Sequence, residues 1–170
     1  MYTTRPKRRP AGYTLIEVLI VVTIIGLVGA IVVPHMLATG TMGIQAAARH
    51  IVADLLYAQN EAYSMQSPRK VVFDVDTNSY RITDSDDNTI YVAWKGGEAS
   101  NYVINFDEDR RFTGVEITSV NFDGGTDVEF DDLGSPDSGG TIELEFKETK
   151  YRVTVAAFTG RITVERVTGG

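Results

Sequence analysis

The sequence predicts an α+β fold in which a long N-terminal helix precedes an antiparallel, β-rich head domain. Two observations indicate this order. The apolar run Leu15–Val33 continues into a stretch with apolar residues at three- and four-residue spacing, and from Lys70 onward the apolar spacing becomes two. With 170 residues, the chain suits one domain with an appendage better than two full domains.

The first twelve residues form a basic leader that contains no acidic residue. Basic residues ahead of an apolar run favour a cytoplasmic N-terminus and an extracytoplasmic remainder. An ordinary secretory signal has small residues after its apolar core, whereas here Ala11 and Gly12 precede the apolar run. We therefore expect that cleavage of residues 1–12 leaves the apolar helix on the mature protein.

The apolar run Leu15–Val33 contains nineteen residues and a single charge, Glu17. As a helix rising ~1.5 Å per residue it spans about 28 Å, close to the hydrocarbon thickness of a bilayer. A buried helix of a soluble protein is the alternative, but a helix that is apolar on every side needs a larger core than the remaining chain supplies. We expect residues 13–34 to cross the inner membrane once, with the following domain in the periplasm.

A second helical segment, residues 35–67, is expected to pack on the head with one face. Gly26 weakens the helix before this segment, and Pro34 removes a helical hydrogen bond, so a kink is predicted at the junction. Pro68 predicts that the helix ends near residues 64–67. The residues expected to be buried are Ile44, Ala47, Ile51, Leu55, Ala58 and Ala62, whereas Arg49, Asp54, Gln59 and Glu61 are expected on other faces.

Residues 68–170 are predicted to form the β-rich head. Short alternating segments are separated by turn-forming Gly, Asp and Asn residues, which is typical of an antiparallel sheet with one solvated face. The expected strands are Lys70–Val75, Ser79–Thr83, Thr89–Trp94, Tyr102–Phe106, Val115–Val120, Asp127–Phe130, Thr141–Phe146, Tyr151–Ala157 and Arg161–Arg166.

The composition argues against several functional classes. Without cysteine the chain cannot form a disulfide framework, a thiolate metal site or a cysteine nucleophile, and two histidines offer little for a catalytic dyad. The oxygen-rich segment Asp84–Asn88 lacks the spacing of an EF-hand loop, so a solvated turn is favoured over a calcium site. We expect no catalytic residues, no resident metal and no cofactor.

The segment Gly12-Tyr13-Thr14-Leu15-Ile16-Glu17 closely resembles the signal of type IV pilins and type II secretion pseudopilins. That signal combines a basic leader ending in Gly, an aromatic residue, and Thr-Leu-Ile-Glu at the start of the apolar helix; Tyr13 stands where phenylalanine is commoner. The resemblance implies that a prepilin peptidase cleaves between Gly12 and Tyr13 and methylates the new amine of Tyr13. It also implies extraction from the membrane by an inner-membrane assembly platform and packing with other pilins or pseudopilins in a filament. Gly26 and Pro34 match the helix-weakening positions of that family.

Glu17 has a physical reason to need a partner. An ionised side chain costs about 2.5–3.5 kcal/mol at mid-bilayer on insertion scales, and buried charges persist when they are paired. Cleavage creates an ammonium at Tyr13, and methylation keeps its positive charge. Glu17 of one subunit can then neutralise the Tyr13 amine of its neighbour, which sets the axial stagger; protonation of Glu17, or contact with lipid headgroups, is the alternative.

Further residues resemble the GspH/FimT family of minor pilins. The matching segments are Ala46–Arg49, Leu55–Ala62, Pro68–Phe73, Phe130–Gly134 and the Gly160-Arg161 turn with its flanking strands. The resemblance implies a long helix packed on an antiparallel β-sandwich-like head. It also implies a role as a minor pseudopilin of a type II secretion system, in or near the filament tip. A minor pilin of a type IV pilus, acting in assembly priming, adhesion or DNA uptake, is the alternative.

The charge balance bears on that alternative. After loss of the leader the chain carries 12 basic and 23 acidic residues, a net charge of −11. Such a surface repels nucleic-acid phosphates, and Gly160-Arg161 is followed by Ile162-Thr163 rather than by further arginines. Nucleic-acid binding is therefore disfavoured. The sequence does not identify the exported substrate, the position along the filament or the partner pilins.

Overall fold

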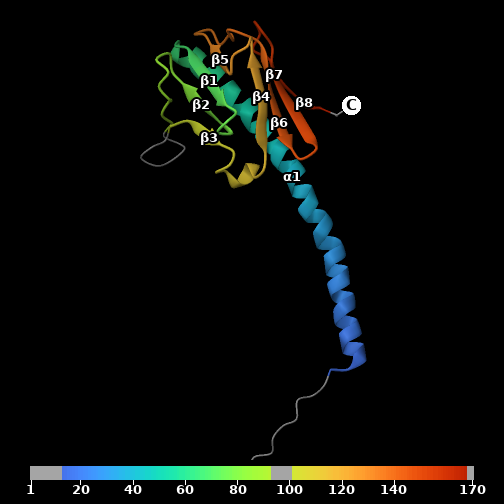
Figure 1. The fold of residues 1–170 in the computed structure, drawn as a ribbon. Coiled ribbons are helices and arrows are strands. Elements are labelled where there is room, and N and C mark those ends of the chain that lie inside the picture. The colour runs from blue at the N-terminus through green and yellow to red at the C-terminus, as the bar shows by residue number, and fades with distance from the viewer. Residues whose placement is uncertain (1–12, 93–100, 168–170) are drawn as a thin grey trace, which may run out of the picture. The chain divides into compact units, whose positions relative to one another are not determined.

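The structure of the chain is a computed structural model that describes the backbone of residues 13–92 and 101–167 and their side chains except for residues 29–41 (Figure 1). The chain divides into two compact units, Met1–Ala38 and Thr39–Gly170. A single helix, α1 (Leu15–Met65), runs through both. The strands and one short 3₁₀ helix lie in the second unit: β1 (Arg69–Asp74), β2 (Ser79–Thr83), β3 (Val103–Asn105), η2 (Arg110–Phe112), β4 (Glu116–Phe122), β5 (Asp127–Phe130), β6 (Gly140–Phe146), β7 (Thr149–Val155) and β8 (Ile162–Val167).

The first half of α1 is apolar and exposed. From Leu15 to Val28 the large apolar side chains are between 49 and 85% exposed, on all sides of the helix. Among the residues whose side chains the structure describes, no helix is both long enough and apolar enough to cross a membrane.

The second half of α1 packs with one face on the head, as the spacing predicted. The six residues expected to be buried, and Ala48 with them, have no exposed surface. Four of these seven are alanines, whose small side chains let the helix lie close to the sheets. The helix ends at Met65, where Gln66 takes a left-handed conformation (φ 48°) and the Ser67 amide donates to the Ala62 carbonyl. The predicted helix end is confirmed.

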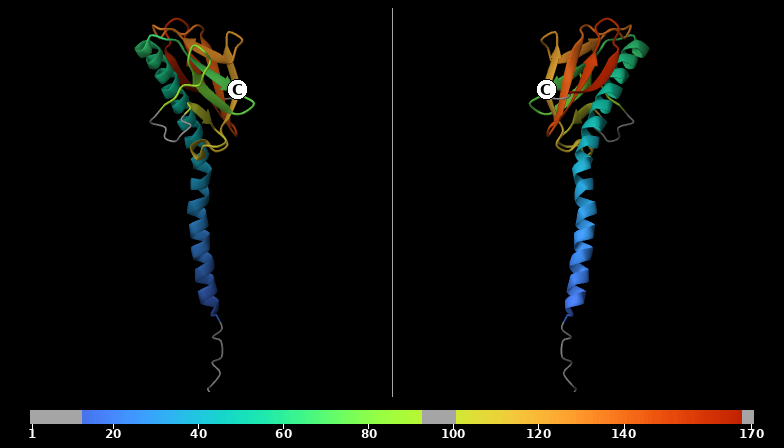
Figure 2. Two further views of the ribbon diagram at one scale, coloured as in Figure 1. Left: turned by 90° about the vertical axis from the view of Figure 1, so that its left-hand side faces the viewer. Right: turned by 90° about the vertical axis from the view of Figure 1, so that its right-hand side faces the viewer.

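The head is a sandwich of two four-stranded antiparallel sheets (Figures 1 and 2). One sheet has the order β3-β2-β1-β5 and the other β4-β6-β7-β8. The registers pair apolar positions across the inner faces, for example Val71 with Ile82 and Ile142 with Val153. Each of these residues is fully buried, so the alternation seen in the sequence does mark the core face.

One predicted strand, Thr89–Trp94, is wrong. Only isolated bridges occur there, at Thr89 and Tyr91, and Trp94 lies outside the described residues. The cause is competition for one edge of β2. The Ile90 amide donates to Ile82 at 2.9 Å, while the Ile82 amide donates to Tyr102, so two segments share the edge and neither forms a long ladder.

Asn78 connects the two sheets. It lies in the turn between β1 and β2 in a left-handed conformation (φ 49°) and is 7% exposed. Its side-chain amide donates to Asp107 Oδ1 (2.8 Å) and to the Val115 carbonyl (2.9 Å), and its Oδ1 accepts from the Ile117 amide (2.9 Å). These bonds hold the start of β4 against the first sheet.

Candidate functional site

The residues of the pilin-like motif lie at the start of α1. The Thr14 carbonyl accepts backbone hydrogen bonds from Glu17 (3.1 Å) and Val18 (3.2 Å), and the Thr14 hydroxyl accepts a third, from the Glu17 amide (3.3 Å). Threonine before the first helical residue, with glutamate three positions later, is the pattern of a capping box. Thr14 and Glu17 therefore also define where the helix begins.

The Glu17 side chain is exposed in the first turn of α1, where a negative charge is favoured by the helix dipole. Tyr13 is 83% exposed. Both residues line one shallow hollow whose remaining wall is Val18, Val21 and Val22. The structure thus brings Tyr13 and Glu17 together on one side of the helix, with the carboxylate open to a cation from another molecule.

The other predicted site residues lie apart from this pair. Gly26 is within the exposed half of α1, and apart from the backbone of its own helix no described atom lies within 4 Å of where a side chain there would begin. The backbone is helical at Pro34, whose side chain is outside the described residues. Gly12, the residue before the expected cleavage, also lies outside them. Cleavage, methylation and the kink at Gly26 and Pro34 stay predictions.

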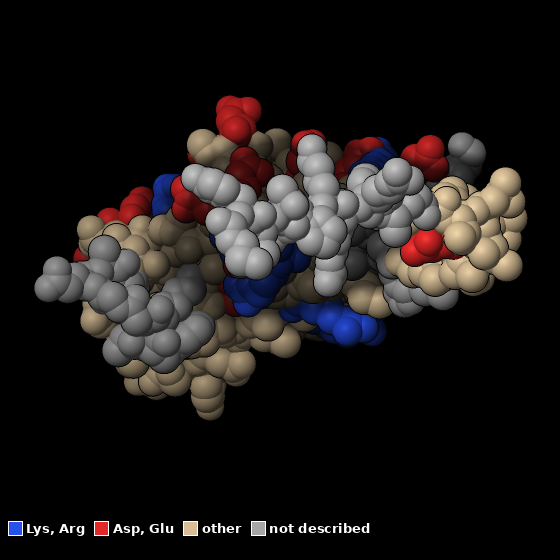
Figure 3. Space-filling model, turned by 90° about the horizontal axis from the view of Figure 1, so that it is seen from below, with Lys and Arg blue, Asp and Glu red and all other residues tan. Residues whose placement is uncertain are grey.

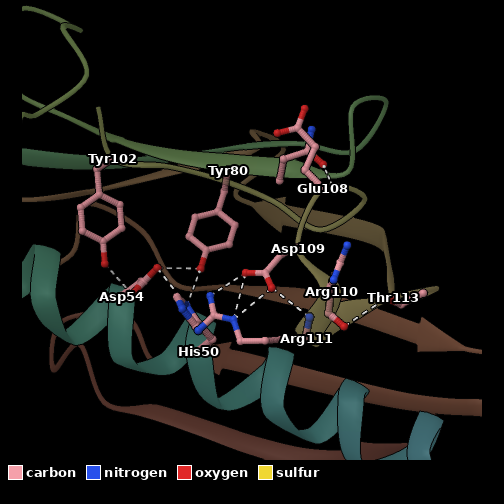
Figure 4. Close-up of polar contacts among 10 residues, drawn as sticks. His50, Asp54, Tyr80, Tyr102, Glu108, Asp109, Arg110, Arg111 and Thr113 are labelled. Carbon is pink, nitrogen blue, oxygen red and sulfur yellow. Dashed lines mark hydrogen bonds and ion pairs between the residues drawn. The ribbon is translucent and has the colours of Figure 1, made fainter. Parts of the chain in front are cut away.

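A buried polar cluster in the head is a feature that the sequence reasoning missed (Figure 4). Asp54 of α1 is only 5% exposed, although the sequence placed it away from the core. Its two carboxylate oxygens accept hydrogen bonds, each 2.7 Å long, from the hydroxyls of Tyr80 and Tyr102. His50 Nδ1 lies 3.2 Å from Asp54 Oδ2 and 3.1 Å from the Tyr80 hydroxyl. A buried carboxylate persists because it is hydrogen-bonded in this way.

The loop that carries η2 borders this cluster. Arg111 makes a bidentate contact with Asp109. Its Nε lies 3.0 Å from each carboxylate oxygen, and its Nη2 lies 2.6 Å from Oδ2. The hydrogen bond from Arg111 lowers the pKa of Asp109 and raises that of Arg111. Burial, and then the carboxylate of Asp54, raise the pKa of the Tyr80 hydroxyl well above its usual value, and Tyr102 is shifted in the same direction.

The geometry gives this cluster a structural role. Asp54, Tyr80 and Tyr102 are each at most 5% exposed, so a substrate has no access to their oxygens. The cluster instead ties α1 to β2 and to the residue before β3. The signal was present in the sequence, because Asp54 lies three residues after Ile51 and four before Ala58, on the predicted apolar face.

The segment Asp84–Asn88 is a closed turn. Asp84 Oδ1 accepts hydrogen bonds from the amides of Asp86 and Asn88, both at 2.9 Å. These bonds contribute to a lowered Asp84 pKa, although burial opposes them. Among the described residues, no three His, Asp or Glu side chains lie in an arrangement that could hold a metal ion. The Asp84 carboxylate thus accepts hydrogen bonds from the backbone of its own turn, as in an Asx turn.

Comparison with known proteins gives a motif and a relative that matches most of the chain. Residues 7–33 match the prokaryotic N-terminal methylation motif. The chain is 25% identical to type II secretion system protein H of Xanthomonas campestris pv. campestris over 159 residues, which cover 92% of this chain and 83% of the relative. The similarity therefore includes the head as well as the helix.

Solved structures agree with the architecture. The minor pseudopilin EpsH of the type 2 secretion system of Vibrio cholerae matches with a TM-score of 0.52 and 17% identity, over 72% of this chain and 96% of that one. The type IV minor pilin FimU of Pseudomonas aeruginosa matches with a TM-score of 0.50 and 17% identity, over 72% and 87%. These likenesses establish the fold, and the predicted α+β class with a helix packed on antiparallel sheets is confirmed.

Proposed function

We infer that this chain, a GspH-like member of the type IV pilin and pseudopilin superfamily, is a minor pseudopilin of a type II protein secretion system. The observation that carries this conclusion is the similarity to type II secretion system protein H over 92% of the chain, together with the methylation motif at residues 7–33. It acts as a structural subunit that assembles with other pilin-like proteins.

Processing by a prepilin peptidase would remove residues 1–12 and methylate the amine of Tyr13. Two features of the described chain support this step. Tyr13 is 83% exposed, and the helix begins only at Leu15, so the new amine would lie on a short non-helical end next to Glu17. The charges of the leader would be lost with it, leaving a strongly acidic mature chain.

Membrane anchoring and filament packing would then use the same apolar helix. The run Leu15–Val33 supports a single inner-membrane span before assembly, with the head in the periplasm. After extraction by the assembly platform, helices of neighbouring subunits would cover the apolar side chains that are exposed between Leu15 and Val28. Glu17 would pair with the methylated Tyr13 amine of the adjacent subunit, and the helix would bend near Gly26 and Pro34.

Two measurements test the proposal. Mass spectrometry of the protein from cells with an active prepilin peptidase should show an N-terminus at methylated Tyr13, and an intact Met1 would contradict the proposal. Glu17→Gln should abolish filament incorporation and export, because the amide cannot neutralise the neighbouring amine. Glu148→Gln, at an exposed position in the turn between β6 and β7, is the matched control and should leave both unchanged.

A minor pilin of a type IV pilus is the second candidate, since FimU shares the fold. It is less favoured because the relative that matches along nearly the whole sequence is a secretion protein. In the view of Figure 3 several acidic side chains lie along the upper edge of the described surface and the basic ones form separate groups. The excess of acidic over basic residues suits DNA retention poorly. Secretion genes beside this gene would favour the first candidate, and pilus genes the second.

A further inference from the structure

Three segments of the head, namely α1 and two loops, meet at the side chain of Gln59 on the helix. Its amide nitrogen donates a 2.7 Å hydrogen bond to the carbonyl of Gly134, in the loop between β5 and β6. In the turn between β7 and β8, a side-chain carbon at Gly160 would overlap that same amide nitrogen and would lie 3.3 Å from Pro136. Gly134, Pro136 and Gly160 are all buried. Gln59 therefore bonds the first loop to the helix, and the second turn packs closely against the same side chain.

Both loops are also held by their own hydrogen bonds. In the first, the Asp131 carboxylate accepts from the amides of Leu133 (3.0 Å) and Ser135 (2.7 Å), and the Asp131 amide donates to the Ser135 carbonyl (2.9 Å). In the second, the Gly160 amide donates to the Ala156 carbonyl at 3.0 Å. Loops built in this way present their outer side chains in fixed positions, which reduces the entropy that a binding partner must remove.

The side chains that these segments present are large and apolar. Tyr63 of α1 is 65% exposed, Leu133 of the first loop 73%, and Phe158 of the second turn 90%. We name these three residues the cap surface. Figures 1 and 2 show the end of α1 and both loops at the same end of the head. Phe158 has a left-handed backbone (φ 66°), a conformation that costs energy for a bulky residue.

The area of the cap surface suits a protein contact. Together the three side chains expose roughly 400 Å², which as one patch is within the range of functional apolar patches on monomers. A standard interface buries about 800 Å² per partner, so this surface would form the centre and the surrounding polar residues would supply the remainder.

We propose that the cap surface docks a different pilin-like subunit, through an apolar recess on that subunit that is bordered by lysine or arginine. Asp131 and Asp132 border Leu133, and Arg161 follows the turn that carries Phe158. A second copy of this chain would bring a net charge of −11 without the leader, so a basic-bordered partner is the complementary one. The identity of the partner as a pilin-like subunit rests on the proposed function.

Photo-crosslinking of the full-length chain, in cells that carry its secretion system, tests this proposal. The crosslinker p-benzoylphenylalanine at position 158 should give one product with a second pilin-like subunit, at a peptide flanked by basic residues. The same crosslinker at Tyr91, which is 66% exposed but belongs to none of the three segments, should give at least tenfold less. Leu133→Asp and Asp132→Lys should each lower the yield at position 158 at least tenfold, whereas Tyr91→Asp should not.

Several outcomes would overturn the proposal: equal yields at positions 158 and 91, a product only with a second copy of this chain or with lipid, or a yield that Asp132→Lys leaves unchanged. Processing at Tyr13, measured in the same samples, separates this result from the proposed function. Correct processing without the crosslink would refute the docking proposal alone, whereas an unprocessed Met1 would refute the proposed function.

Discussion

Asp54→Ala removes the carboxylate that joins α1 to the tyrosines of the head, while alanine preserves the helix. Two hydrogen bonds of 2.7 Å to a charged acceptor are lost, from Tyr80 and Tyr102. A hydrogen bond to a charged group contributes about 1.5–3 kcal/mol, and Tyr80 keeps a second neighbour in His50 at 3.1 Å. The expected decrease in the free energy of unfolding is therefore about 3–5 kcal/mol, a large share of the stability of an ordinary domain.

Urea unfolding of the chain in detergent micelles, followed by the near-ultraviolet circular dichroism of its tyrosines, measures this decrease. Tyr102→Phe removes one of the two bonds and should cost about half as much. In the double variant with Asp54→Ala, the two costs should fall short of additivity by at least about 1 kcal/mol, because both changes remove the same bond. Tyr91→Phe is the control and should lie within about 0.5 kcal/mol of the parent, since Tyr91 is 66% exposed.

The reasoning fails if Asp54→Ala unfolds at the same urea concentration as the parent. It also fails if the costs of Asp54→Ala and Tyr102→Phe simply add, because the carboxylate and the hydroxyl would then stabilise the head independently of one another.

Three more predictions follow from the same contacts. Above pH 10 the free energy of unfolding should fall by up to about 2.7 kcal/mol per pH unit. The reason is that Tyr80 and Tyr102 have raised pKa values and keep their protons in the folded chain, whereas the unfolded chain releases them. Urea titrations at pH 9, 10 and 11 measure the slope. Asn78→Ala should cost about 2–4 kcal/mol, since three hydrogen bonds, two of them buried, are lost at a left-handed position; an unchanged urea midpoint would refute this. Gly160→Ala should cost about 2–3 kcal/mol, because a side chain at φ 61° is strained and would overlap the Gln59 amide; the thermal midpoint should drop by several degrees.

Local patterns in the sequence were sufficient for most of the fold. The strands Ser79–Thr83 and Asp127–Phe130 have their predicted bounds, and the helix ends where Pro68 required. These elements are bounded by residues whose own backbone preferences stop a strand or a helix. The failure at Thr89–Trp94 has a different origin, since which segment pairs with an edge of β2 depends on contacts far apart in the chain.

The same limit applies to single side chains. The polar character of Asp54 and Gln59 placed both away from the core, although Asp54 has the spacing of the apolar face. The donors that allow Asp54 to be buried are 26 and 48 residues away, and the carbonyl that receives the Gln59 amide is 75 residues away. No local pattern contains those partners. The Gly160-Arg161 and Phe130–Gly134 segments were recognised only as family features, and their meeting at Gln59 is visible only in three dimensions.

Two acids of α1, Glu17 and Asp54, show how the position of a carboxylate decides its role. Asp54 receives its donors from the same head, so it contributes to the stability of one molecule. Glu17 is exposed in the first turn, and among the described residues no side chain donates to it. In the proposed assembly, its apolar surroundings require a counter-charge once water is excluded, and the Tyr13 amine of the neighbouring subunit would supply it. Asp54→Ala should therefore weaken the fold without altering processing at Tyr13, while Glu17→Gln should leave urea unfolding unchanged and stop assembly. Loss of stability in Glu17→Gln would show that its partner lies within its own chain, and the argument for pairing between subunits would fail.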